Sequence, residues 1–459
     1  MDETSLAFAG ATRQSELLRA GEVSPRELVE TYLRRIERLD PDLNAFRKVL
    51  AERALTEADQ AAGRLRAGDD RPLLGIPVAV KDDVGVAGEV RTDGTNAYGE
   101  PEREDWEIVR LLRAAGAIVI GITNVPELTI WPFTETPTWG ITRNPWDPQR
   151  TPGGSSGGSG AAVAAGLASL ATGSDGGGSI RIPAAFCGLA GLKPQRDRIQ
   201  YLPGGGPHWH GLSVVGGLAR TVADAALFYE AVTGLPWRQA AADDPGKLRV
   251  ALSAKVPPGI MAKVEPGLLR ATEEIAELLR SLGHEVVERD PDYGVAGLHW
   301  AMRWMAGVHD DARGMPHPER LEPRTRSMAR LGAVVKRTGG LRWGDESEAT
   351  DATRINAIFD DVDVVLGPGT ARPPQPVGAY TGAGFVRTWN GVTATVPFQA
   401  VWNHVGNPAI TIPSGLSPEG LPTSVQLAGR PDGEETLLAL AGQIERARPW
   451  AERRPPLAG

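Results

Sequence analysis

Short runs of consecutive apolar residues recur along this chain, separated by stretches with the spacing of amphipathic helices. The runs have the length of strands that are buried on both faces. They lie at residues 76–80, 118–120, 248–252, 362–366, 410–412 and 425–427. Helical periodicity is clearest after residue 25, after residue 221 and over residues 434–444. Strands that alternate with helices in this way predict an α/β fold.

Two of these helices begin with recognisable capping residues. Ser24 to Glu27 (SPRE) has the sequence of a capping box with proline in the first helical turn. Thr221 stands in the same position before the helix that runs to Val232. Each signal therefore fixes where a helix begins.

Two segments lack a regular pattern. Residues 195–217 contain Pro203, three consecutive glycines, and the pair His208 and His210. This composition predicts a long irregular loop, and such loops usually have a functional reason. The polar stretch 253–350 is interpreted as an elaboration on the core rather than as a separate domain.

Composition limits the classes of partner and the compartment. The chain has 459 residues with a formal net charge of −8, which argues against nucleic acid or an anionic membrane as a main partner. Its longest uncharged run, 151–174, is mostly Gly, Ser and Ala and is not a membrane span. One cysteine, Cys187, excludes an internal disulfide and suits a reducing cytosol. Charged residues near the N-terminus leave no visible secretory signal, so we expect a cytoplasmic protein.

Candidate chemistry lies in two glycine-rich turns that each carry a serine, and in one lysine. Ser155 and Ser179 stand on either side of an apolar, helix-like stretch, and Lys81 ends the apolar run 76–80. A serine becomes a good nucleophile only when a base takes its proton. Lysine can be that base if burial lowers its pKa far below ~10.4. A lysine at the end of a strand is more often a surface residue, so only the presence of the two serines makes Lys81 a candidate base.

The same segments carry a family resemblance. GGSSGGSGAAVAAGLASLATGSDGGGSIRIPA (153–184) fits the signature of the amidase signature hydrolases throughout. GIPVAVKDD, TRNPWDPQRTPGGSS, GLKP, ARTVADAAL, NHVGNPAITIPSG and GLPTSVQLAGR are similar to further segments of that family. The resemblance covers nearly the whole chain. It implies one amidase signature domain over 1–459, with a mixed twisted sheet wrapped by helices, a catalytic core at about 70–195 and 360–445, and a variable region at about 195–350.

The resemblance also implies roles for individual residues. Ser179 is the expected nucleophile, Lys81 the ultimate base, and Ser155 the bridging serine, held by a cis peptide bond to Gly154. The backbone N–H groups from Gly176, Gly177 and Gly178 to Ser179 are expected to form an oxyanion hole. No cofactor and no metal are expected.

Two departures from the family pattern concern the site directly. Gly176 stands where Thr or Ile is common, which predicts a looser oxyanion turn. Asp83 stands where Asn is usual after the lysine. Because a facing carboxylate would favour the charged lysine, we expect Asp83 to point away from Lys81. Asp197 and Gly217 depart as well, and they bear only on the 195–217 loop.

Other sequence signals are weaker. Residues 153–157 match G-x-S-x-G, but Arg150-Thr151-Pro152 precedes them instead of the apolar strand that a nucleophile elbow requires. His208 and His210 have metal-ligand spacing without a third ligand at motif distance. Cys187 is interpreted as a packing residue.

The tryptophans and the family resemblance bear on substrate preference. Tryptophans outside the regular elements (131, 139, 209, 300, 304 and 402) favour an aromatic or bulky apolar group. By the resemblance, Thr138, Trp139, Ile141 and Gln399 are expected to line the acyl pocket. We expect a small-molecule amide substrate, with aryl acylamides favoured and esters or carbamates (urethanes) also open.

Two alternatives stay open at this point. One is the glutaminase component of a tRNA-dependent amidotransferase, and the other is a non-catalytic scaffold. A homodimer is one option for the oligomeric state, which the sequence does not fix.

Overall fold

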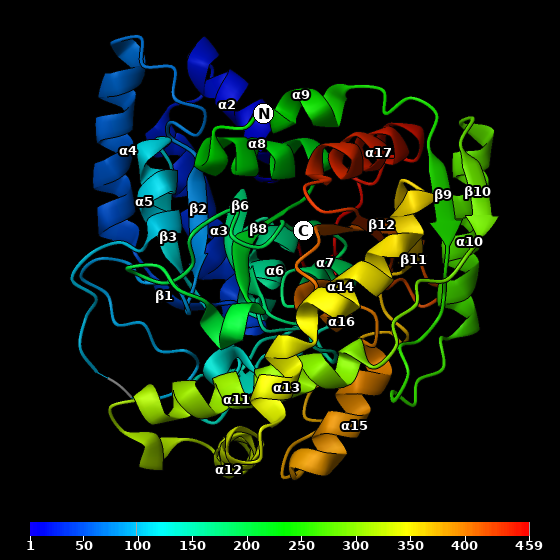
Figure 1. The fold of residues 1–459 in the computed structure, drawn as a ribbon. Coiled ribbons are helices and arrows are strands. Elements are labelled where there is room, and N and C mark those ends of the chain that lie inside the picture. Colours follow the sequence, from blue (N-terminus) through cyan, green and yellow to red (C-terminus); the bar gives the residue numbers. More distant parts are fainter. Residues whose placement is uncertain (98, 459) are drawn as a thin grey trace.

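Most of the predicted apolar runs are strands of one mixed sheet (Figure 1). The computed structural model describes residues 1–97 and 99–458. In spatial order the 11 strands are β1 (Phe46–Val49), β3 (Ile118–Thr123), β2 (Pro77–Lys81), β6 (Leu170–Asp175), β8 (Val214–Ala219), β7 (Ala190–Lys193), β12 (Ala409–Leu416), β13 (Pro422–Gly429), β11 (Val364–Pro368), β9 (Arg249–Leu252) and β10 (Glu285–Glu288). A separate ribbon pairs β4 (Glu135–Thr136) with β5 (Gly140–Ile141). The predicted α/β class is thus confirmed.

Strand β2 lies inside the sheet, between two parallel neighbours. It pairs with β3 on one side and with β6 on the other. All five residues of β2 are buried, which explains the apolar run that precedes Lys81. Lys81, the last residue of β2, therefore enters the protein interior rather than the surface.

Helices cover both faces of the sheet, and several begin where the sequence predicts. They are α1 (Glu3–Ala7), α2 (Gly10–Ala20), α3 (Pro25–Leu43), α4 (Ala51–Arg66), α5 (Glu107–Ala114), α6 (Gly157–Ala164), α7 (Arg181–Cys187), α8 (Val222–Thr233), α9 (Trp237–Ala242), α10 (Pro266–Ser281), α11 (Ala296–Gly314), α12 (Pro323–Arg337), α13 (Gly340–Glu346), α14 (Glu348–Asn356), α15 (Phe385–Thr395), α16 (Ala400–His404) and α17 (Glu434–Ala447). Before α3, the Ser24 hydroxyl accepts from the Glu27 N–H while the Glu27 carboxylate accepts from the Ser24 N–H. Thr221 caps α8 through its side chain, which accepts from the Asp224 N–H.

The polar region 253–350 is mainly helical. It contains α10, the edge strand β10 of the main sheet, and then α11 to α13. Helices α11, α12 and α13 pack on one another and lie with α15 below the sheet in Figure 1. Apolar residues of these helices, Trp304 among them, form a second hydrophobic cluster with Trp131 and Trp209 from preceding segments, separate from the main core.

The predicted loop over 195–217 is shorter than expected. A 3₁₀ turn forms at His208–Gly211, and strand β8 already begins at Val214. The sequence misleads here because Gly216 and Gly217 are strand residues. A Cβ on Gly217 would lie 2.8 Å from the Phe228 ring, so this strand needs glycine to pack against α8.

Among the described residues, no helix combines the length and the apolar character that crossing a membrane requires.

Candidate active site

The buried end of β2 brings Lys81 to the first serine turn. The Lys81 Nζ donates to Ser155 Oγ at 2.8 Å and to Ser174 Oγ at 2.6 Å. Ser174 belongs to the neighbouring strand β6, whose pairing with β2 sets this distance. Lys81 side-chain exposure is 0 %, so the ammonium or amine has no contact with bulk water.

Asp83 also reaches Lys81, contrary to the expectation that it points away. Its Oδ2 lies 3.0 Å from Lys81 Nζ and accepts a hydrogen bond from the Tyr201 hydroxyl at 3.1 Å. Burial lowers the pKa of Lys81 below its usual value, although the facing Asp83 carboxylate opposes this effect. The expectation was wrong because Asp83 is itself held by Ser174 and Tyr201 inside the site.

The turn that carries Ser155 is built on glycine. The peptide bond between Gly154 and Ser155 is cis, as the resemblance implies. A Cβ on Gly154 would lie 2.4 Å from the Trp131 carbonyl oxygen, so no larger residue fits beside this serine. Ser155 is buried and accepts a hydrogen bond from Lys81.

Ser179 lies at the second turn, between β6 and α7. Its carbonyl oxygen accepts from the Ser156 N–H at 3.2 Å, so the two serine turns are hydrogen-bonded neighbours. Ser179 is half-buried and lines a cavity, whereas Ser155 lies deeper. The structure thus brings Lys81, Ser155 and the Ser179 turn together at one place.

The three glycines before Ser179 are not equivalent. The Gly178 N–H donates to Asp175 Oδ1 at 2.7 Å and is therefore occupied within the protein. The N–H groups of Gly176 and Gly177 donate to none of the described residues. The space that a side chain would fill at Gly176 is taken by the Trp209 ring, which packs against this turn.

A fully buried ion pair supports the turn from behind. Arg181 binds the Asp175 carboxylate through two nitrogens, each at 3.0 Å. Asn403 adds a hydrogen bond from its Nδ2 to Asp175 Oδ1 at 2.9 Å. Burial alone would raise the pKa of Asp175, but the Arg181 guanidinium outweighs it, and the pKa is held well below its usual range. The carboxylate therefore stays ionised and fixes the Gly178 N–H.

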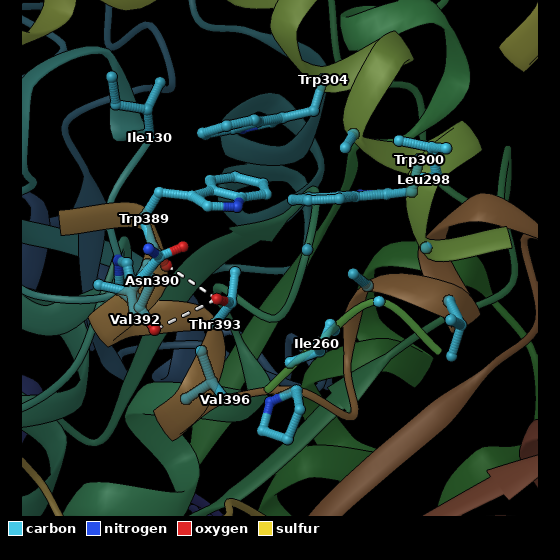
Figure 2. Close-up of a pocket in the computed structure, with 18 of the residues that line it drawn as sticks. Ile130, Ile260, Leu298, Trp300, Trp304, Trp389, Asn390, Val392, Thr393 and Val396 are labelled. Carbon is cyan, nitrogen blue, oxygen red and sulfur yellow. Dashed lines mark hydrogen bonds between the residues drawn. The ribbon is translucent and has the colours of Figure 1, made fainter. Parts of the chain in front are cut away.

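An apolar cavity of about 450 Å³ opens over Ser179. Its walls include five tryptophans, at positions 131, 209, 300, 304 and 389. Figure 2 shows Trp300, Trp304 and Trp389 as neighbouring layers, with Trp300 and Trp304 stacked at 5.4 Å between ring centroids. Exposed apolar side chains, Met261 and Leu298 among them, line it as well.

The residues expected to line the acyl pocket lie elsewhere. Thr138 is exposed, and Trp139 stacks beneath the Arg47 guanidinium at 5.5 Å. Ile141 lines a different hollow, beside Arg324 and Phe385. Gln399 is buried, donates to the Gly369 carbonyl and packs against Gly178, so it supports the turn from outside the cavity lining.

The cavity also uses one tryptophan, Trp389, that the sequence did not indicate. Trp389 comes from α15, while Trp300 and Trp304 come from α11 rather than from loops. Trp402, which the sequence groups with them, is buried in α16 away from the cavity lining. The excess of tryptophan was the available signal, and four of the six tryptophans named from the sequence, at positions 131, 209, 300 and 304, line the cavity.

Potential metal ligands gather at two places. His208 and His210 face Asp311 and Asp310 at 3.3 and 3.2 Å, respectively. A buried cluster elsewhere joins His299 and His404 to the carboxylate of Asp351.

In the cluster of His299, Asp351 and His404, the protons lie where hydrogen bonds between these residues require them. The Arg303 guanidinium, which only donates, lies 3.3 Å from His404 Nδ1. The proton of His404 therefore lies on Nε2, which donates to Asp351 Oδ2 at 2.9 Å. Burial and Arg303 lower the pKa of His404 to about 4, in keeping with a neutral ring. To bind a metal, Nε2 would have to lose this proton to Nδ1, the nitrogen that faces the Arg303 guanidinium.

Cys187 is buried and its Sγ lies 3.4 Å from the Pro152 carbonyl oxygen. Burial raises the pKa of its thiol, which disfavours the nucleophilic thiolate.

Known proteins resemble this chain over its whole length. The putative amidase AmiB2 of Mycobacterium tuberculosis (strain ATCC 25618 / H37Rv) is 53% identical over 466 residues, with 100% of each chain covered. The 6-aminohexanoate-cyclic-dimer hydrolase of Paenarthrobacter ureafaciens is 32% identical, with 97% of this chain and 96% of that protein covered.

Solved structures agree with these relatives. A 6-aminohexanoate cyclic dimer hydrolase in complex with substrate superposes with a TM-score of 0.89 at 29% identity, covering 99% of this chain and 100% of that one. A bacterial aryl acylamidase shares the fold, with a TM-score of 0.85 at 24% identity, covering 96% and 97% of the two chains. The sequence model of the amidase family matches residues 27–438, and the chain belongs to the amidase signature family of amide-hydrolysing enzymes.

Proposed function

We propose that this protein hydrolyses linear amides through an acyl-enzyme on Ser179, with Ser155 and Lys81 as its proton relay. The observation that supports this most is the 2.8 Å hydrogen bond between Lys81 Nζ and Ser155 Oγ in a buried site. A desolvated lysine loses its proton more readily than one in water. In its neutral form it can accept a proton from a hydroxyl.

The reaction divides into two acyl transfers. Ser179 Oγ attacks the carbonyl carbon while its proton passes to Ser155, whose own proton passes to Lys81. Collapse of the tetrahedral intermediate breaks the C–N bond, and the proton returns through Ser155 to the departing amine. A water molecule, deprotonated through the same relay, then attacks the acyl-Ser179 ester, which releases the acid and restores Ser179.

The N–H groups of Gly176 and Gly177, which donate to none of the described residues, supply the charge stabilisation that this chemistry needs. A tetrahedral intermediate carries negative charge on the former carbonyl oxygen. Because Gly178 is bonded to Asp175, we assign the oxyanion to Gly176 and Gly177 with the N–H of Ser179, rather than to all three glycines.

The cavity favours a flat or apolar substrate. Five tryptophans and few polar atoms surround the space over Ser179, and aromatic walls of this kind bind apolar and planar groups. Glutamine would need buried polar partners for its amino and carboxyl groups, so a glutaminase function has little support here. Aryl acylamides come first among the amides we propose, and aryl esters and carbamates, with the same planar group and a reactive carbonyl, are further candidates.

Labelling and a substrate panel test this function. Ser179→Ala should lose reaction with a fluorophosphonate probe and at least about 10³-fold of kcat/KM on 4-nitroacetanilide. Ser156→Ala is the matched control, because Ser156 lies in the adjacent turn and its hydroxyl faces the Ser174 carbonyl instead of Lys81. A folded Ser179→Ala protein with near wild-type turnover contradicts the proposal.

The same panel separates the alternatives. Wild-type enzyme is assayed on 4-nitroacetanilide, a 4-nitrophenyl ester, an aryl carbamate and glutamine. Glutamine hydrolysis at a kcat/KM equal to that of the anilide would favour the amidotransferase component instead.

A further inference from the structure

Two side chains donate hydrogen bonds to the oxyanion turn, each at a different carbonyl group. The Asn403 Nδ2 donates to the Asp175 carbonyl oxygen at 2.7 Å. The Trp300 Nε1 donates to the Gly176 carbonyl oxygen at 2.8 Å. Neither carbonyl belongs to the groups that would touch a substrate, so both bonds act on the orientation of the turn.

Peptide geometry connects these bonds to the N–H groups. A trans peptide unit is planar, and its C=O and N–H point in opposite directions. The Gly176 carbonyl and the Gly177 N–H share one such unit, and the Asp175 carbonyl and the Gly176 N–H share the one before it. Trp300 therefore fixes the direction of the Gly177 N–H, and Asn403 fixes that of the Gly176 N–H.

The indole of Trp300 is itself held in place. A Cβ on Gly177 would lie 2.6 Å from its Cζ2 atom, so the ring lies directly against the turn. The Trp300 ring also stacks with Trp304 and with Trp389, at 5.4 and 6.3 Å between ring centroids (Figure 2). Both neighbours line the same cavity as Trp300.

One carboxylate aligns the helices that carry the two donors. Asp351 Oδ2 bonds His299, the residue before Trp300 on α11, and His404, the residue after Asn403 on α16. The two helices are thereby held in a common register behind the glycine turn. This gives the hydrogen-bond cluster of His299, Asp351 and His404 a role in placing Trp300 and Asn403.

We propose that Trp300 is a positioning residue of the oxyanion hole: its indole N–H orients the Gly177 N–H, while its ring forms a wall of the substrate cavity. The inference rests on the proposed function, since it presumes an oxyanion beside Ser179. In this proposal the Trp300 side chain serves both substrate binding and charge stabilisation. A substrate that contacts the stacked tryptophans therefore also affects the orientation of the oxyanion turn.

The test removes the N–H group and keeps an aromatic ring. Trp300→Phe should lower kcat on 4-nitroacetanilide at least about 10-fold, less than the 10²–10³-fold typical for loss of an oxyanion donor itself. Trp304→Phe is the matched comparison, because Trp304 lies in the same stack and makes no hydrogen bond through its indole among the described residues. Trp304→Phe should raise KM for 4-nitroacetanilide, because Trp304 lines the substrate cavity.

A second measurement distinguishes orientation from packing. Binding of a trifluoromethyl ketone, whose adduct with serine carries the oxyanion, should weaken in Trp300→Phe by the same factor as kcat/KM. In Trp304→Phe, inhibitor and substrate should weaken together without a fall in kcat. If Trp300→Phe lowers the melting temperature, replacing Trp300 by 3-benzothienylalanine, which exchanges only the N–H for sulfur, decides the question.

The outcomes separate this inference from the function on which it rests. An unchanged kcat in Trp300→Phe, or equal kcat losses in both tryptophan variants, overturns the positioning role while Ser179→Ala still abolishes turnover. An active Ser179→Ala protein would remove the proposed function itself.

Discussion

Replacing Asp83 by asparagine should move the acid limb of the pH–rate profile to lower pH. Asp83 Oδ2 lies 3.0 Å from Lys81 Nζ, and both side chains are buried. Asparagine has the same shape and still offers an oxygen to Ser174 and Tyr201, so the change removes charge with little loss of volume.

The size of the effect follows from the distance. Two unit charges 3.0 Å apart attract each other by roughly 5 kcal/mol at an effective dielectric constant of ~20. The asparagine oxygen retains part of this stabilisation, so the pKa of Lys81 should fall, but by less than loss of the full attraction would cause. Only neutral Lys81 accepts a proton, and a lower pKa keeps it neutral at lower pH. The acid limb therefore moves down, and the plateau rate falls somewhat because the amine becomes a weaker base.

The assay is kcat/KM on 4-nitroacetanilide from pH 5 to pH 10 for the wild type and Asp83→Asn. Asp93→Asn is the matched control: Asp93 is also buried, and it acts on Lys81 only through space and more weakly than Asp83. It should shift the limb in the same direction by less. A limb that stays in place in Asp83→Asn, or moves to higher pH, would show that the titrating group is not a Lys81 paired with a charged Asp83.

Three further results are expected. Trp389→Ala should raise the ratio of KM for 4-nitroacetanilide to KM for acetamide about threefold or more, because an aromatic contact is lost. Ile141→Gly should leave this ratio unchanged, because Ile141 lines another hollow. Equal ratios in the two variants would refute the assignment of the cavity. Arg181→Ala leaves Asp175 buried and unpaired, so urea denaturation should show a loss of about 3–5 kcal/mol in the free energy of unfolding, and a loss under about 1 kcal/mol would contradict the role of this pair. Dialysis against EDTA should not change activity, since the cluster around Asp351 is interpreted as a hydrogen-bond network; activity lost and then restored by Zn²⁺ would refute that interpretation.

The residues of the proposed relay could be predicted because they follow local rules. Lys81 ends a run that is apolar on both faces, and such a run predicts a buried strand. Ser155 and Ser179 lie in turns where larger residues collide with backbone or ring atoms, which is why glycine surrounds them in the sequence. Family resemblance then assigned roles that the spacing alone left open.

The cavity wall could not be predicted in the same way. Trp300 lies more than 100 residues from Ser179 in the sequence, on a helix with polar residues on its outer face. Nothing local indicates that α11 packs beside the glycine turn, because that contact depends on how α11, α16 and α14 meet around Asp351. The family resemblance placed Thr138 and Trp139 at the acyl pocket, yet they lie in the turn between β4 and β5 and do not line the cavity over Ser179.

Asp83 and burial act on the pKa of Lys81 in opposite directions. Considered alone, a carboxylate beside the lysine favours the ammonium, and so a catalytic base would avoid it. Within the buried end of β2, however, desolvation acts on Lys81 in the opposite direction and is the larger effect. A lysine with burial alone would be neutral but weakly basic, and one with Asp83 alone would stay protonated. Because general-base catalysis is most efficient when the pKa of the base lies near the working pH, the two opposing effects together suit Lys81 to a proton relay better than either would alone.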